Sequence, residues 1–136
     1  MIVVDTSVFA YFWILGNSTV VAQSLASVDP AWKAPRLWRS EFRNVLAPLV
    51  RTRKMDERTA VAAVRGAEKQ MAEGECEVDS AEVLRLAAAS GATAYDGEFV
   101  ALARQLGVPL VTGERRLAKA FPDEALLLES ALEGLP

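Results

Sequence analysis

The chain opens with the segment IVVDTS, residues 2–7, in which three β-branched apolar residues precede an aspartate and two hydroxyl residues. A β-branched run favours a strand, and Thr6 and Ser7 offer side-chain oxygens that cap a helix. The segment therefore predicts a strand that turns at Asp5 into a helix reaching Ile14.

The same alternation of short apolar runs and helical patterns continues along the chain. Further strands are expected at residues 32–34, 76–78, 109–112 and 126–128. Further helices are expected at residues 17–28, from 35 to about 48, and at 56–74, 79–90, 96–106 and 114–121. Strands that alternate with helices predict a mostly parallel central sheet covered on both faces, an α/β fold in three layers.

Length and composition favour one domain over residues 1–136. Of the 136 residues 51% are hydrophobic, which is enough for a single buried core. The apolar stretch from Val8 to Leu15 is too short to cross a bilayer and follows no basic leader, so we expect neither a signal peptide nor a membrane helix. Cys76 is the only cysteine, which excludes an internal disulfide and favours the reducing cytoplasm.

The residue inventory excludes several kinds of catalytic site. The chain has no histidine and one cysteine, so it cannot form the shells that zinc prefers, a Ser-His-Asp triad or a Cys-His pair. Its formal net charge is −3, so it is not a polycation that coats nucleic acid. Hard oxygen ligands remain as the available metal chemistry.

Glu41 stands out within the predicted long helix. At 100° per residue it lies on the apolar side, one turn from Leu37 and from Val45. A carboxylate that faces the interior is unfavourable unless it is paired or binds a cation. The open alternative is a side chain at the edge of the stripe that reaches water or pairs with an arginine. Pro48 is expected to kink or end this helix.

Three more acids, Asp5, Asp96 and Glu114, each lie between an extended run and the start of a helix. Taken singly they are ordinary helix caps or partners of a helix dipole. In a parallel sheet, however, the ligand crevice lies beyond the carboxyl ends of the strands, where these side chains would meet Glu41. Four like charges in one cleft require raised pKa values or a multivalent cation. Carboxylate ligands indicate Mg²⁺ or Mn²⁺.

A basic stretch lies around the same predicted helix. Between residues 33 and 54 there are seven bases and one acid. Either this is a solvated helix face or it contacts phosphate groups. The candidates for gripping flanking phosphates are Arg39, Arg43, Arg115 and Arg116.

Four segments also match a known family in order and spacing. They are IVVDTS (2–7), EFRNVL (41–46), YD (95–96) before an Ala/Leu-rich helix, and LVTGERRL (110–117). Together they resemble PIN-domain nucleases, and more narrowly the VapC-type toxins of prokaryotic toxin–antitoxin pairs. The resemblance spans nearly the whole chain.

The resemblance implies a PIN-like three-layer α/β/α fold and assigns individual residues. The metal-site acids of the family fall on Asp5, Glu41 and Asp96. Glu114 falls where the family usually has an aspartate; this departure leaves open whether Glu114 binds metal directly, through water or not at all. Thr6 and Thr112 fall on hydroxyl positions near the family site. Pro48 is a second departure, because the matching helix is generally uninterrupted.

The expected function is Mg²⁺- or Mn²⁺-dependent hydrolysis of RNA phosphodiester bonds by an endoribonuclease. Single-stranded or loop RNA is the expected substrate, because an unpaired backbone enters a cleft more readily than a duplex. The resemblance further implies a homodimeric toxin, inhibited by a small antitoxin whose extended segment lies across the cleft. We expect the gene immediately upstream to encode that antitoxin.

Two other readings of the sequence stay open. A phosphatase of the haloacid-dehalogenase type also begins with a strand that ends in aspartate, but it needs a second acid two residues later, where this chain has Ser7. A non-catalytic binding module would keep the fold while Glu114 marks a decayed site. Titration with Mn²⁺ separates a decayed site from an active one.

Overall fold

Five short parallel strands form the centre of the molecule in the computed structural model, which describes residues 1–133. The strands are β1 (Ile2–Val4), β2 (Trp32–Pro35), β3 (Glu75–Cys76), β4 (Leu110–Thr112) and β5 (Ala125–Leu127). Their order across the sheet is β3-β2-β1-β4-β5. Val3 is paired with Lys33 on one side and with Leu110 on the other, so the predicted first strand is the central one.

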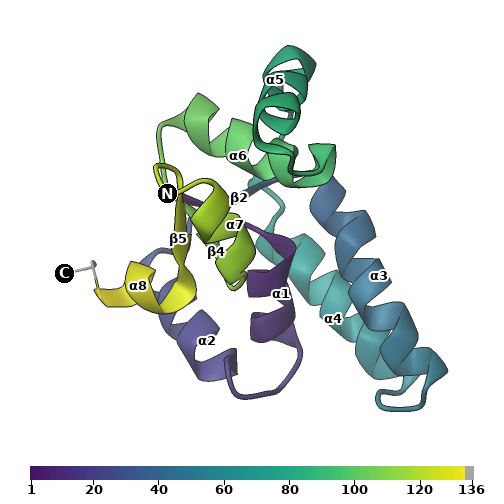
Figure 1. Cartoon of the computed structure of the whole chain (residues 1–136). Helices are drawn as coiled ribbons and strands as arrows, with labels where there is room; N and C mark the ends of the chain where they lie inside the picture. Colours follow the sequence, from purple (N-terminus) through teal and green to yellow (C-terminus); the bar gives the residue numbers. More distant parts are fainter. Residues whose placement is uncertain (134–136) are drawn as a thin grey trace.

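Helices cover both faces of this sheet. They are α1 (Thr6–Trp13), α2 (Thr19–Val28), α3 (Leu37–Arg51), α4 (Glu57–Gln70), α5 (Ser80–Ser90), α6 (Ala94–Leu106), α7 (Arg115–Ala120) and α8 (Leu128–Glu133). Helix α6 packs on β1, β2 and β4 from one face, and α1 packs on β1 and β4 from the other (Figure 1). The predicted three-layer α/β/α fold with a parallel sheet is confirmed.

Several helix ends follow from local signals in the sequence. Asp56 and Asp79 cap α4 and α5 with their side chains, as predicted. Gly91 and Gly107 end α5 and α6 in the left-handed conformation, with φ of 73° and 66°. Glycine adopts this conformation without the strain that a Cβ atom brings, which explains why both helices stop there.

Other boundaries differ from the prediction. The cap of α1 is Asp5 itself, whose side chain accepts from the backbone amides of Ser7 and Val8. The extended run expected immediately before Asp96 does not form a strand, because Thr93 caps α6 and places Asp96 in the first turn of that helix. A hydroxyl residue three positions upstream is the signal for this cap.

Two further differences concern helices α3 and α8. Helix α3 runs through Pro48 and ends at Arg51, so the proline does not terminate it. Helix α8, at Leu128–Glu133, was not expected. It packs on α2, which provides a tertiary contact that local sequence does not reveal. Residues 134–136 of the predicted domain lie outside the described part of the chain.

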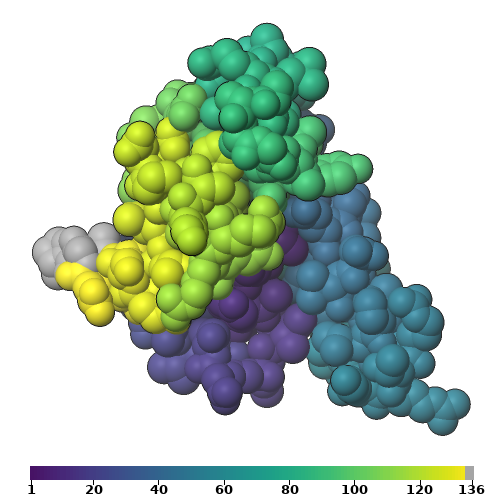
Figure 2. Space-filling model, in the orientation of Figure 1, coloured from purple at the N-terminus to yellow at the C-terminus, as the bar shows by residue number. Residues whose placement is uncertain are grey.

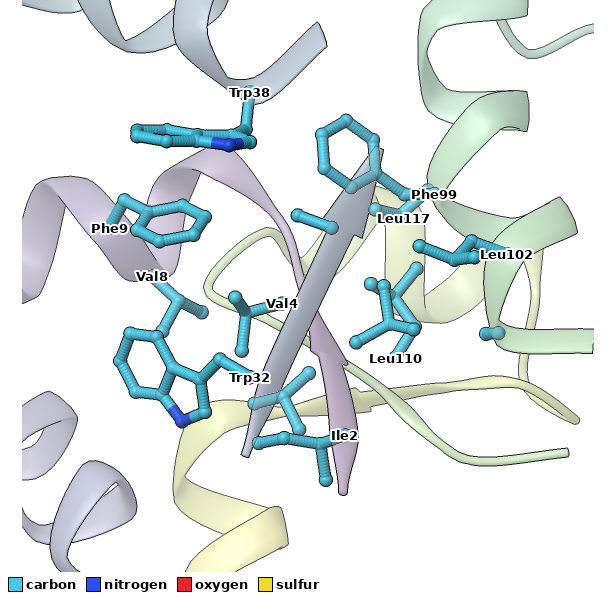
Figure 3. Close-up of a cluster of buried hydrophobic side chains, with 14 of the residues drawn as sticks. Ile2, Val4, Val8, Phe9, Trp32, Trp38, Phe99, Leu102, Leu110 and Leu117 are labelled. Carbon is cyan, nitrogen blue, oxygen red and sulfur yellow. The ribbon is translucent and has the colours of Figure 1, made fainter. Parts of the chain in front are cut away.

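An aromatic cluster fixes α1 and α3 relative to the sheet. Phe9 stacks on Trp38 with ring centroids 4.7 Å apart and meets Trp32 edge-on at 5.8 Å (Figure 3). All three side chains are buried. Such pairs add about 0.5–1.5 kcal/mol each beyond the burial of their surface. The cluster therefore holds the N-terminal parts of α1 and α3, which carry Thr6 and Glu41, in a fixed relation.

No helix within the described residues combines the length and the apolar character that crossing a membrane requires.

Candidate active site

The candidate site lies where the connections of two neighbouring strands diverge. The chain leaves β1 toward β2 on one side and leaves β4 toward β5 on the other. In open parallel sheets this divergence creates the crevice in which ligands bind. Figure 2 shows the purple N-terminal region between the yellow-green region of α7 and the blue region of α3. Asp5 directly follows β1, and Glu114 follows β4 by two residues.

Asp5 is held firmly at the end of β1. Its backbone amide donates to the carbonyl of Val111 at 3.2 Å, which extends the ladder between β1 and β4. Its Oδ1 accepts from the amide of Ser7 at 3.1 Å and from the Ser7 hydroxyl. Its Oδ2 accepts from the hydroxyl of Thr112. The orientation of this carboxylate is therefore set by both strands and by the start of α1.

A chain of hydroxyl contacts joins the two strand ends. The amide of Gly113 donates to Ser7 Oγ at 2.8 Å, and the amide of Glu114 donates to Thr112 Oγ1 at 2.9 Å. Only glycine fits at position 113, because Tyr11 lies against it. A Cβ atom there would be only 2.2 Å from the Tyr11 ring. Thr112, expected near the site, thus links the loop after β4 to Asp5.

Burial controls the ionisation of Asp5. Only 5% of the residue is exposed, and this burial raises the pKa of its carboxyl to about 6, although hydrogen bonds from Ser7 and Thr112 oppose the rise. The negative charge of Glu114 raises it further. A buried carboxylate of this kind gains from a nearby cation, because the cation restores the charged form.

Glu41 faces the same pocket from α3. Its Oε1 accepts from Thr6 Oγ1 at 2.6 Å, so Thr6 orients it. Burial raises the pKa of Glu41, and the negative charges of Asp96, Glu114 and Glu98 raise it as well. Glu41 is half-buried at the wall of the pocket, between the predicted interior orientation and the alternative position at the edge of the apolar stripe, and no arginine within residues 1–133 pairs with it.

Asp96 and Glu114 share one cation. Arg116 Nη2 lies 3.0 Å from Asp96 Oδ2 and 3.5 Å from Glu114 Oε2. The Asp96 side chain is 18% exposed, whereas Glu114 is 51% exposed. Glu114 therefore lies at the rim of the pocket, which agrees with an indirect rather than a central position for this longer acid.

All four predicted acids line one pocket of about 350 Å³. The structure adds residues that the sequence analysis did not assign to the site, namely Ser7, Ala10, Tyr11, Asn44, Val45 and Phe99. Two of these residues could have been predicted from helical spacing. Tyr11 follows Ser7 by four residues, and Asn44 follows Glu41 by three, so each pair shares a helix face.

The basic residues divide into different surroundings. Arg39 is not a free phosphate contact, because its guanidinium is paired with Glu75 at 2.7 Å and with Glu68. Arg43 lines a separate apolar groove of about 710 Å³ between α3 and α4, which lacks the acidic residues of the site. Of the predicted phosphate contacts, only Arg116 touches the pocket acids in the described chain.

The donor set fits a hard divalent ion. Carboxylate and hydroxyl oxygens dominate the polar lining, which suits Mg²⁺ or Mn²⁺. In residues 1–133, no three Asp, Glu, Cys or His side chains are arranged to hold one ion together. Mg²⁺ commonly keeps several waters and binds through only one or two carboxylates. The pocket thus fits a hydrated ion, and direct ligation by all four acids would require side-chain movement.

Comparisons with known proteins give structural relatives only. No protein-family profile matches the sequence, and no curated protein does. The structure resembles PAE2754 from Pyrobaculum aerophilum, with 25% identity, a TM-score of 0.74 and coverage of 97% of this chain and 93% of that one.

Two further solved structures share the fold. VapC20 from Mycobacterium tuberculosis, a toxin that cleaves the sarcin-ricin loop, has 20% identity, a TM-score of 0.65 and coverage of 88% of this chain and 95% of that one. FitAB bound to the IR36 DNA fragment has 18% identity, a TM-score of 0.72 and coverage of 94% and 95%. The chain therefore shares the fold of these solved structures, VapC20 among them, which is the fold that the resemblance of its motifs implied.

Proposed function

We propose that the protein is a Mg²⁺- or Mn²⁺-dependent endoribonuclease and the toxin of a type II toxin–antitoxin pair. The observation that supports this most is the convergence of Asp5, Glu41, Asp96 and Glu114 on one pocket at the divergence of β1 and β4. The fold shared with VapC20, a toxin that cleaves the sarcin-ricin loop, supports the same function.

In the proposed reaction, water attacks an RNA phosphorus atom, and the bond from phosphorus to the leaving sugar oxygen breaks. A bound divalent ion would lower the pKa of water and neutralise charge on the phosphate. Asp5 and Asp96 are the principal candidates for holding that ion. Glu41 would orient the attacking water or accept its proton, while the leaving oxygen takes a proton from solvent.

The environment of Glu41 suits a proton acceptor. Its raised pKa makes the ionised carboxylate a stronger proton acceptor. The Thr6 hydroxyl holds one of its oxygens in place. Thr6 and Thr112 would therefore act as positioning residues, the first for Glu41 and the second for Asp5.

Partners follow from the same proposal. The substrate would be single-stranded or loop RNA in the cytoplasm, and a small antitoxin would cover the cleft. A homodimer is also proposed, from the family resemblance. An antitoxin gene immediately upstream would support the toxin role, and an isolated gene would weaken it without affecting the nuclease assignment.

The phosphatase alternative has little support in the site. The required second acid would stand at position 7, where the Ser7 hydroxyl instead bonds Asp5 and accepts from Gly113. The binding-module alternative gains one supporting observation, because Arg116 already pairs with Asp96. Mn²⁺ titration distinguishes it, since a decayed site gives no binding heat.

Cleavage of an RNA that contains single-stranded loops, with and without Mn²⁺, tests the enzyme assignment. We expect Asp5→Asn to abolish Mn²⁺-dependent cleavage while the protein remains folded. Glu77→Gln is a matched control. It also removes one carboxylate, but the Glu77 side chain is exposed and lies outside the pocket. Undiminished cleavage by Asp5→Asn, or equal loss in both variants, would refute the assignment.

A further inference from the structure

Arg116 extends from the first turn of α7 to the first turn of α6, across the rim of the acidic pocket. Its Nη2 lies 3.0 Å from Asp96 Oδ2 and 3.5 Å from Glu114 Oε2. The Arg116 side chain is 63% exposed, so it reaches over the pocket from solvent and is not built into the core. It can leave these partners without disturbing the packing of the fold.

Arg116 is also the only cation that pairs with any of the four pocket acids in residues 1–133. Asp5 and Glu41 have hydroxyl and amide partners instead. The repulsion among these carboxylates is thus relieved at one point only, on Asp96 and Glu114. A guanidinium has the charge and the donor geometry that carboxylate oxygens accept.

From this arrangement we infer that Arg116 is a built-in counter-ion of the pocket and competes with the divalent ion for Asp96. The inference rests on the proposed metal site. An ion that binds Asp96 Oδ2 meets the guanidinium at the same oxygen, and two cations so close repel each other. Ion binding therefore displaces Arg116, and the intact ion pair weakens the apparent affinity for the metal.

The expected size of the effect follows from the exposure of the pair. Exposed ion pairs have modest strength, which corresponds to a change of about two- to fivefold in a competing equilibrium. Removal of the guanidinium should therefore tighten Mn²⁺ binding by about two- to fivefold relative to a variant that loses the same charge nearby. A residue that merely supports the fold would not improve metal binding when removed.

Arg115 provides that matched control. It precedes Arg116 on α7, is exposed, and makes no ion pair with the described residues. Arg115→Gln and Arg116→Gln lower the net charge equally, so both change the long-range field of the protein. Only Arg116→Gln removes the contact with Asp96 and Glu114. The difference between the two variants therefore isolates that contact.

Isothermal titration with MnCl₂ on the wild type, Arg115→Gln and Arg116→Gln, at one low ionic strength, tests the inference without any activity measurement. We expect Arg116→Gln to bind Mn²⁺ about two- to fivefold more tightly than Arg115→Gln. Binding by Arg116→Gln alone would also support it. Equal affinities, or weaker binding by Arg116→Gln, would overturn the inference and leave the metal site standing. Absence of binding in all three proteins would overturn both.

Discussion

Replacement of Asp5 by asparagine should stabilise the metal-free fold at neutral pH even though it removes a proposed metal ligand. Burial raises the pKa of Asp5 from 3.8 to about 6. The folded protein therefore binds this proton more tightly than the unfolded chain does. The resulting stability is fully present below pH 3.8 and is lost as the pH rises through about 6. Asparagine has a similar shape and stays neutral throughout.

The size of the gain follows from the same shift. A difference of about 2.2 pKa units corresponds to about 3 kcal/mol in the free energy of unfolding near pH 7.5. For a chain of this length that is a rise of about 10 °C in Tm as an upper limit, because the amide group replaces an oxygen that accepts from Thr112. Near pH 4 the gain should fall below about 1 kcal/mol, since Asp5 is then already protonated in the folded state.

Thermal unfolding of the wild type and Asp5→Asn in EDTA, followed by circular dichroism from pH 4 to pH 8, measures this effect. The difference in Tm between the two proteins should grow as the pH rises from 3.8 through about 6. Glu77→Gln, at an exposed site, should show little difference at any pH. A difference that is constant with pH, or a less stable Asp5→Asn at pH 7.5, would show that burial of the charge does not govern this residue.

Three further predictions concern the surroundings of Asp5. Thr112→Val should lower the free energy of unfolding by about 1–3 kcal/mol in urea titrations, because the Asp5 carboxylate and the Glu114 amide lose a buried partner; an unchanged midpoint would contradict this. Gly113→Ala should destabilise the fold by about 1–3 kcal/mol in the same assay, because the added Cβ meets the Tyr11 ring, and a neutral effect would argue against that contact. Glu114→Gln should weaken Mn²⁺ binding in calorimetry by about tenfold, as expected for an outer partner, whereas complete loss would make Glu114 a principal ligand.

Much of the fold was predictable because its signals are local. The β-branched run before Asp5, the capping residues Asp56 and Asp79, and the glycines that end α5 and α6 each act within a few residues. The position of Glu41 was predictable from helical phase, since a carboxylate on an apolar stripe has few favourable surroundings. The rule that parallel strands place their carboxyl ends at one edge accounts for the meeting of Asp5 and Glu114, but not for Asp96, which enters the pocket from the first turn of α6.

The missed features depend on contacts between distant segments. Ser7 accepts from the amide of Gly113, and Arg116 reaches Asp96 on another helix; neither contact has a signature in the local sequence. Arg39 was one candidate for a phosphate contact, and the ion pairs with Glu68 and Glu75 that exclude this role could not be predicted because they join three separate elements. Charged side chains on a helix face have many potential partners, and only the tertiary arrangement selects among them.

The proposed reaction requires that Asp5, beyond β1, and Asp96, in α6, share one divalent ion. A crystal structure of the protein grown with Mn²⁺, with anomalous scattering recorded at the manganese edge, tests it most directly. We expect one strong anomalous peak in contact with Asp5 and Asp96, with Arg116 turned away from Asp96. A peak bound elsewhere, or an acidic pocket without any peak at saturating Mn²⁺, would show that these two acids do not share an ion.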